Sequence, residues 1–96
     1  MPNNQNPRDS RRVFVITGAG QGLGRAYASM FGQRGQLVVA IDVNEEAASS
    51  VAEEISAGGG ECLPIVADIA NAAAVKAAVQ QIDQRYGRAD VLINNA

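Results

Sequence analysis

Apolar residues follow two different patterns along this chain. Four short runs are almost continuously apolar, which is typical of strands covered on both faces. These runs are residues 13–16, 37–41, 63–67 and 91–93. Between them lie three stretches in which apolar residues recur at helical spacing. The alternation predicts an α/β fold with three crossover helices, a parallel doubly wound sheet and, because crossovers are right-handed, the strand order 3-2-1-4.

Each predicted helix has a stripe that we expect to face the sheet. The stripes are Leu23, Ala26, Tyr27, Met30 and Phe31 in the first helix, Ala47, Val51 and Ile55 in the second, and Val75, Val79, Ile82 and Tyr86 in the third. Asn44 and Asn71 are suited to cap the second and third helices, and Gly35 and Gly87 follow helix ends. Pro64 favours an edge position for the third strand, because proline cannot donate to a strand ladder.

A glycine-rich turn at residues 18–24 joins the first strand to the first helix. Such a turn places backbone N–H groups at a positive helix N-terminus, where a pyrophosphate can bind. Gly18 suits the sharp turn, Gly22 the close approach of the pyrophosphate, and Gly24 the packing of the helix against the sheet. The alternative is a tight strand-to-helix turn without a ligand.

Asp42 stands at the end of the second strand, eighteen residues after Gly24. A carboxylate there can accept hydrogen bonds from the ribose hydroxyls of a dinucleotide. It would repel a 2′-phosphate by roughly 1–4 kcal/mol, so NAD is expected and NADP is disfavoured. Asp42 is also a candidate cap for the following helix, and the two roles are compatible.

The spacing Thr17-Gly18-x-x-x-Gly22-x-Gly24 resembles the turn of the single-domain branch of the short-chain dehydrogenase/reductase family, whose nucleotide-binding fold is of the Rossmann type. Asp68-Ile69 is similar to the adenine-contacting pair of that family, and Asn94-Asn95-Ala96 resembles its N-N-A-G motif. The alternatives are that Asp68 only caps a helix and that the asparagines only end a strand. Together with the turn, the resemblance gives these candidate cofactor contacts: Gly18, Ala19, Gly20, Gln21, Gly22, Leu23, Gly24, Asp42, Asp68, Ile69 and Asn95.

The resemblance implies an oxidoreductase that transfers a hydride between NAD and an alcohol or carbonyl compound. Residues 24–28 are reminiscent of members that act on 3-hydroxyacyl or 3-oxoacyl thioesters. The family's catalytic serine and its tyrosine and lysine, four residues apart, have no counterpart here, since Lys76 is the only lysine. We therefore expect residues 12–96 to be the truncated NAD-binding segment of a homo-oligomeric parent enzyme. The parent would bind the small-molecule substrate, and the fragment alone would be inactive.

Two other functional classes compete with this interpretation. One is a module that senses a nucleotide without turnover, and the other is a scaffold that keeps the fold without binding. The intact glycine turn and Asp42 argue against the scaffold. A serine and a Tyr-x-x-x-Lys motif beyond Ala96 would exclude the sensor.

Composition narrows the chemistry further. The chain of 96 residues is 47% hydrophobic with a net charge of −2, which fits one globular domain. A single cysteine, Cys62, and no histidine exclude an internal disulfide, a Ser-His pair and a typical zinc site, so no metal is expected. Basic residues are scattered and only four aromatic side chains are present, so no nucleic acid partner is expected.

The chain carries no pattern of membrane insertion or export. Its apolar runs are far shorter than the ~20 residues that cross a bilayer. Residues 1–11 are polar and lack the apolar segment of a signal peptide, which predicts a flexible N-terminal tail and a cytoplasmic location.

Overall fold

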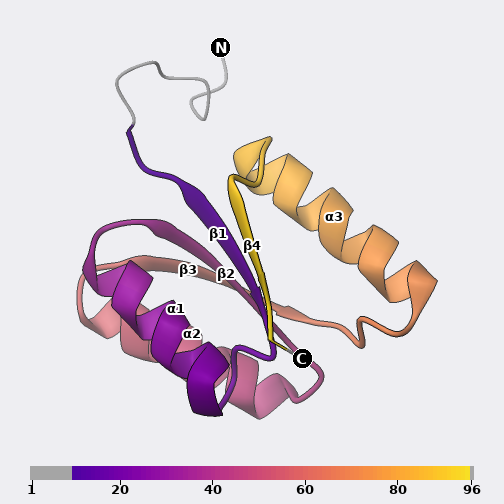
Figure 1. Cartoon of the computed structure of the whole chain (residues 1–96), viewed down its shortest axis with the longest axis horizontal. Helices are drawn as coiled ribbons and strands as arrows, with labels where there is room; N and C mark the ends of the chain where they lie inside the picture. The colour runs from indigo at the N-terminus through magenta and orange to yellow at the C-terminus, as the bar shows by residue number, and fades with distance from the viewer. Residues whose placement is uncertain (1–9, 96) are drawn as a thin grey trace.

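The computed structural model describes residues 10–95 and contains one four-stranded parallel sheet (Figure 1). The strands are β1 (Val13–Thr17), β2 (Leu37–Asp42), β3 (Glu61–Val66) and β4 (Val91–Asn94). The helices are α1 (Gly22–Gln33), α2 (Glu45–Ala57) and α3 (Ala72–Tyr86). The sheet order is β3-β2-β1-β4, so the predicted order 3-2-1-4 and the three crossover helices are confirmed. Pro64 accordingly lies in an edge strand.

Helices cover both faces of the sheet (Figure 1). Alternate residues of β1 point to opposite faces, as the period of a strand requires. Ile16 belongs to the apolar cluster that includes Val51 of α2, whereas Val15 packs in the cluster that includes Ile82 of α3. All five residues of β1 and all six of β2 are buried, which explains why the central strands are continuous apolar runs in the sequence.

The side chains of Asn44 and Asn71 start α2 and α3 as predicted. Asn44 Oδ1 accepts a hydrogen bond from the Ala47 N–H at 2.9 Å, and Asn71 Oδ1 accepts one from the Ala74 N–H at 3.0 Å. At the start of α1, Gln21 has an extended backbone but its side chain makes no capping hydrogen bond. The described helices therefore differ at their N-termini, and the uncapped one is the helix that follows the glycine turn.

The predicted core-facing stripe of α1 is partly wrong. Leu23 is 61% exposed and Ala26 is also exposed, whereas the buried residues of α1 are Gly24, Ala28 and Gly32. Small residues face inward because α1 lies close to the sheet and to α2. The helix itself was placed correctly, but its buried face was assigned to the larger side chains.

The predicted stripe of α3 holds only at its C-terminal half. Ile82 and Tyr86 are buried, but Val75 is 38% exposed and Val79 is 57% exposed. Both valines line an apolar groove of about 260 Å³ that also includes Leu92 of β4. The described residues leave this groove open, so the N-terminal half of α3 has little to pack against.

The carboxyl ends of all four strands meet at one edge of the sheet. Thr17 lies in register with Ile41 on one side and Asn94 on the other. The chain reverses its direction of travel across the sheet at β1, which makes this edge the switch point where such folds bind ligands. Residues 1–9 of the predicted tail lie outside the described residues, and Arg11 forms an ion pair with Glu61 at 3.8 Å.

Candidate cofactor site

A cavity of about 630 Å³ opens at the carboxyl edge of the sheet. Its walls are formed by Gly18, Gln21, Gly22, Leu23, Ile41, Asp42, Val43, Ala67, Asp68, Ile69 and Asn95. Eight of the eleven candidate contacts are brought together there, from four separate parts of the chain. Ala19, Gly20 and Gly24 do not line the cavity and instead lie in the base of the turn.

Backbone geometry explains the glycines of the turn. Gly18 and Gly22 have φ values of 63° and 60°, in the left-handed region that favours glycine. A Cβ on Gly22 would have no atom within 4 Å, so this position is open on the cavity side. A Cβ on Gly24 would lie 2.2 Å from the Gly18 carbonyl oxygen, so only glycine lets α1 start this close to the turn.

The N–H groups of the turn differ from those at the start of α1 in whether the protein supplies an acceptor for them. The Ala19 N–H donates to the Ile41 carbonyl at 3.1 Å, and the Gly20 N–H donates to Asp42 Oδ2 at 2.9 Å. The first N–H groups of α1 have no intrahelical acceptor, as at any helix start, and the side chain of Gln21 makes no capping hydrogen bond to them. The N–H groups of Ala19 and Gly20 thus have acceptors within the protein, whereas the residues at the start of α1, Gly22 and Leu23, line the cavity.

Asp42 is buried, with 8% of its surface exposed, and it joins the turn to the start of α2. Its Oδ2 accepts from the Gly20 N–H, and its Oδ1 accepts from the Asn44 N–H at 3.0 Å. Asn44 caps α2, so the alternative role of Asp42 as the helix cap is wrong. Each carboxylate oxygen has a second lone pair, which leaves acceptor capacity on the cavity side.

Asp68 and Ile69, which follow β3, form another part of the cavity wall. The Asp68 carboxylate accepts from the Ala70 N–H at 2.9 Å, which closes a local turn ahead of α3. Asn71 caps that helix, so Asp68 is not the cap that one alternative predicted. Ile69 is 38% exposed and presents an apolar surface to the cavity.

Asn94 and Asn95 bind the end of β1 as well as ending β4. The Thr17 hydroxyl donates to Asn94 Oδ1 at 2.9 Å and accepts from the Asn95 N–H at 3.0 Å. Asn95 Nδ2 also donates to the Gly18 carbonyl at 3.4 Å. Thr17 was not among the candidate residues, although its place directly before Gly18 was a usable signal. These contacts join the two strands that border the switch point.

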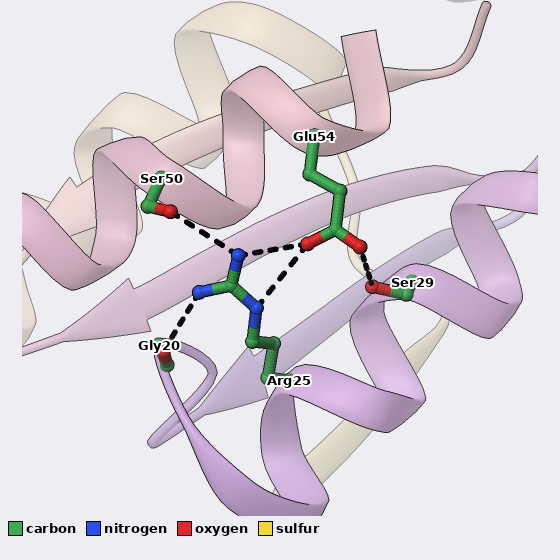
Figure 2. Close-up of polar contacts among 5 residues, drawn as sticks. All are labelled: Gly20, Arg25, Ser29, Ser50 and Glu54. Carbon is green, nitrogen blue, oxygen red and sulfur yellow. Dashed lines mark hydrogen bonds and ion pairs between the residues drawn. The ribbon is translucent and has the colours of Figure 1, made fainter. Parts of the chain in front are cut away.

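Arg25 is a second residue that the sequence reasoning missed. Figure 2 shows its guanidinium between the turn, α1 and α2, where Nη1 donates to the Gly20 carbonyl at 3.2 Å. The same group is paired with Glu54, with 2.8 Å between Nη2 and Oε1. Its position directly after Gly24 placed it beside the turn in the sequence, but only the fold shows that it turns back toward Gly20.

The charges around the cavity are acidic. Asp42 and Asp68 are the charged residues in its described lining, which includes no lysine or arginine. No group of three metal-ligating side chains occurs within residues 10–95. Cys62 is not part of the cavity lining, and its partial burial against the core raises the pKa of its thiol to about 11, which disfavours the thiolate at neutral pH.

These features define a Rossmann-type dinucleotide-binding unit: a parallel sheet, a glycine turn, an uncapped helix and an acidic residue after the second strand. A family model described as short chain dehydrogenase matches residues 12–96. The chain belongs to the short chain dehydrogenase family. No helix within the described part of the chain combines the length and apolarity that a membrane span requires.

The proteins that resemble this chain are longer than it. The chain is 42% identical over 85 residues to the (2S)-[(R)-hydroxy(phenyl)methyl]succinyl-CoA dehydrogenase subunit BbsD of Thauera aromatica, covering 88% of this chain and 34% of that protein. A metagenomic short-chain oxidoreductase solved in complex with NADP superposes with a TM-score of 0.84 at 38% identity, covering 88% of this chain and 38% of that one. An NAD⁺-bound xylitol dehydrogenase gives a TM-score of 0.84 at 30% identity, covering 88% and 33%. The chain thus spans about a third of the length of the relatives it matches.

Proposed function

We propose that residues 12–96 are the NAD-binding segment of an oxidoreductase that moves a hydride between NAD and an alcohol or carbonyl compound. The observation that carries the proposal is the uncapped start of α1, which opens on a cavity walled by the buried Asp42. The family relationship supports a dinucleotide as the ligand, because relatives have been solved with NADP and with NAD⁺ bound.

We propose a position for each part of the cofactor. The pyrophosphate would accept hydrogen bonds from the backbone of Gly22 and Leu23 at the positive end of α1. The adenosine ribose would lie against Asp42 and the adenine between Asp68 and Ile69. Asn95 would lie on the side toward the nicotinamide. Residues 12–96 would bind and orient the cofactor, while the proton transfer would use groups outside them.

We propose NAD as the preferred cofactor because of the charge at the ribose. A 2′-phosphate beside Asp42 would be repelled by roughly 1–4 kcal/mol. The described cavity lining offers no cation to offset this repulsion. Val43, which follows Asp42 and is 66% exposed, is apolar and cannot bind a phosphate.

Calorimetric titration of the full-length protein with NAD and NADP tests this preference. The wild type should bind NAD more tightly than NADP. In Asp42→Ala, the ratio of the NADP dissociation constant to the NAD dissociation constant should fall about tenfold, which corresponds to a free energy within the range of the repulsion given above. Asp68→Asn is the matched control, because it removes a carboxylate at the adenine wall and should leave the ratio unchanged. An unchanged ratio in Asp42→Ala, with the melting temperature of each variant recorded, would contradict the assignment.

We further propose a 3-hydroxyacyl or 3-oxoacyl thioester as the substrate of the full-length protein. The proposal is supported by residues 24–28 and by a relative named as a dehydrogenase of a succinyl-CoA derivative. Assays of NADH oxidation with a 3-oxoacyl-CoA, and with a ketone of equal chain length, provide the test. Turnover of the ketone alone would contradict it.

The assembly and location of the protein are also proposals. We propose a cytoplasmic homo-oligomer, since the family often assembles through segments beyond those present here. Light scattering of the full-length protein should give more than one subunit mass, and cell fractionation should recover it with the cytosol. A monomer in scattering, or recovery outside the cytosol, would contradict the respective part.

A further inference from the structure

We propose that Arg25 is a positioning residue: it fixes the peptide group between Gly20 and Gln21 so that the Gln21 N–H is directed toward the cofactor's pyrophosphate. The inference rests on the proposed function, because it assigns a role within the same dinucleotide site. It concerns a side chain that does not line the cavity and that would not touch the cofactor.

The guanidinium of Arg25 connects three parts of the fold (Figure 2). Its Nη1 donates to the Gly20 carbonyl at 3.2 Å. On the other side, Nε and Nη2 donate to Glu54 Oε1 at 3.2 and 2.8 Å, and Nη2 also donates to the Ser50 hydroxyl at 3.1 Å. Both acceptor side chains belong to α2, so Arg25 ties the turn to a helix that is itself anchored in the core.

Gly20 is held at both ends of its backbone. Asp42 Oδ2 accepts from its N–H at 2.9 Å, and Arg25 donates to its carbonyl. The peptide unit is planar and trans, so the N–H of Gln21 points away from the Gly20 carbonyl oxygen and hence away from the guanidinium. Gln21 lines the cavity, whereas Arg25 and Glu54 do not. Fixing the carbonyl on the α2 side therefore directs this donor to the cavity side.

The ion pair between Arg25 and Glu54 is expected to contribute little to the stability of the fold. The side chains of Arg25 and Glu54 are 32% and 50% exposed, and ion pairs of that exposure contribute little to folding. Arginine is suited to the task because its planar fork donates in several directions at once, whereas a lysine ammonium is a flexible point charge. A lysine here can pair with Glu54 but cannot also hold the Gly20 carbonyl in the same fixed geometry.

The test is calorimetric titration of the full-length wild type and of Arg25→Lys with NAD, ADP and adenosine. Arg25→Lys should bind NAD and ADP roughly five- to tenfold more weakly, as expected when one oriented hydrogen-bond donor is lost. Its affinity for adenosine, which has no pyrophosphate, should stay within twofold of the wild type. Arg25→Ala should behave in the same way, and both melting temperatures should stay within a few degrees of the wild type.

Arg85→Lys is the matched control. Arg85 also bridges two elements through an exposed pair, with 3.3 Å to Glu61, but at the other side of the molecule from the turn. This variant should bind all three ligands as the wild type does. Wild-type affinity of Arg25→Lys for ADP, or an equal loss for adenosine, would overturn the positioning role while leaving the proposed function standing. Failure of the wild type itself to bind NAD would overturn both.

Discussion

At the residue scale, Asp42 combines an observed structural task with a proposed binding task, and both depend on the same carboxylate oxygens. Its carboxylate accepts from the Gly20 and Asn44 amides, and it also forms the wall where the ribose is expected. The residue that we propose to select the cofactor thereby also fixes the shape of the turn. For this reason the ratio of NAD to NADP affinity is a better measure of its selective role than either affinity alone.

Gly24 gives the sharpest prediction for stability. In Gly24→Ala the new methyl would lie 2.2 Å from the Gly18 oxygen and 2.7 Å from Asn95 Nδ2, so α1 must shift away from the turn. The free energy of unfolding should fall by about 1–3 kcal/mol, as measured by urea denaturation of the full-length protein. Gly58→Ala is the control, since its methyl would meet atoms at 3.6 and 3.8 Å and should be tolerated. Equal losses in the two variants would contradict the close approach at Gly24.

At the scale of elements, the described helices differ in whether a side chain caps their N-terminus. Asparagine side chains cap α2 and α3, and α1 begins at Gln21 without such a cap. An uncapped N-terminus leaves backbone donors unsatisfied by the protein, which lowers the stability of the free chain. The same donors are what we propose the pyrophosphate to bind, so the proposed site coincides with the helix start that lacks a side-chain cap.

Adding a capping side chain to α1 should therefore raise the stability of the protein and lower its affinity for NAD. Gln21→Asp supplies a capping carboxylate, and the expected gain in free energy of unfolding is about 0.5–1 kcal/mol. The same carboxylate would compete with and repel the pyrophosphate, so NAD affinity should fall at least tenfold. Thermal melting and calorimetry measure the two effects. An unchanged affinity for NAD would show that the start of α1 does not bind the cofactor.

The sequence predicted the elements better than it predicted which helix faces are buried. Strands were recognisable because they are covered on both faces, and Asn44 and Asn71 marked two helix starts. Helical spacing shows which residues share a face, but it does not show how closely that face approaches its neighbour. Leu23 and Val79 were therefore assigned to the core and are exposed. The proposed role of Arg25 depends on contacts with Ser50 and Glu54, which lie 25 and 29 residues away along the chain, so no local pattern reveals them.

At the scale of the whole molecule, distant segments of the chain meet at the end of the sheet where β1 and β4 begin. The Val13 N–H donates to Asp90 Oδ2 at 2.7 Å, and the Asp90 N–H donates to the Val13 carbonyl at 2.9 Å. This reciprocal pair fixes the start of β4 beside the start of β1. The hydrogen bond from Val13, followed by the Arg88 guanidinium, lowers the pKa of Asp90 below its ordinary value of 3.8.

The lowered pKa of Asp90 predicts how stability depends on pH. A carboxyl with a lower pKa in the folded state adds stability above its unfolded value, near 3.8, and loses it as pH falls through the folded value. Asp90→Ala should reduce the free energy of unfolding by about 1 kcal/mol at neutral pH. The difference from the wild type should shrink below the unfolded pKa, as urea denaturation at several pH values would show. A difference that does not change with pH would contradict the role of the charged form.

The most direct test of the account is a crystal structure of the full-length protein with NAD bound. We expect the pyrophosphate oxygens within hydrogen-bonding distance of the backbone N–H groups at the start of α1. The adenosine ribose hydroxyls should contact the Asp42 carboxylate. A cofactor bound elsewhere, or with its pyrophosphate away from residues 21–23, would contradict the account.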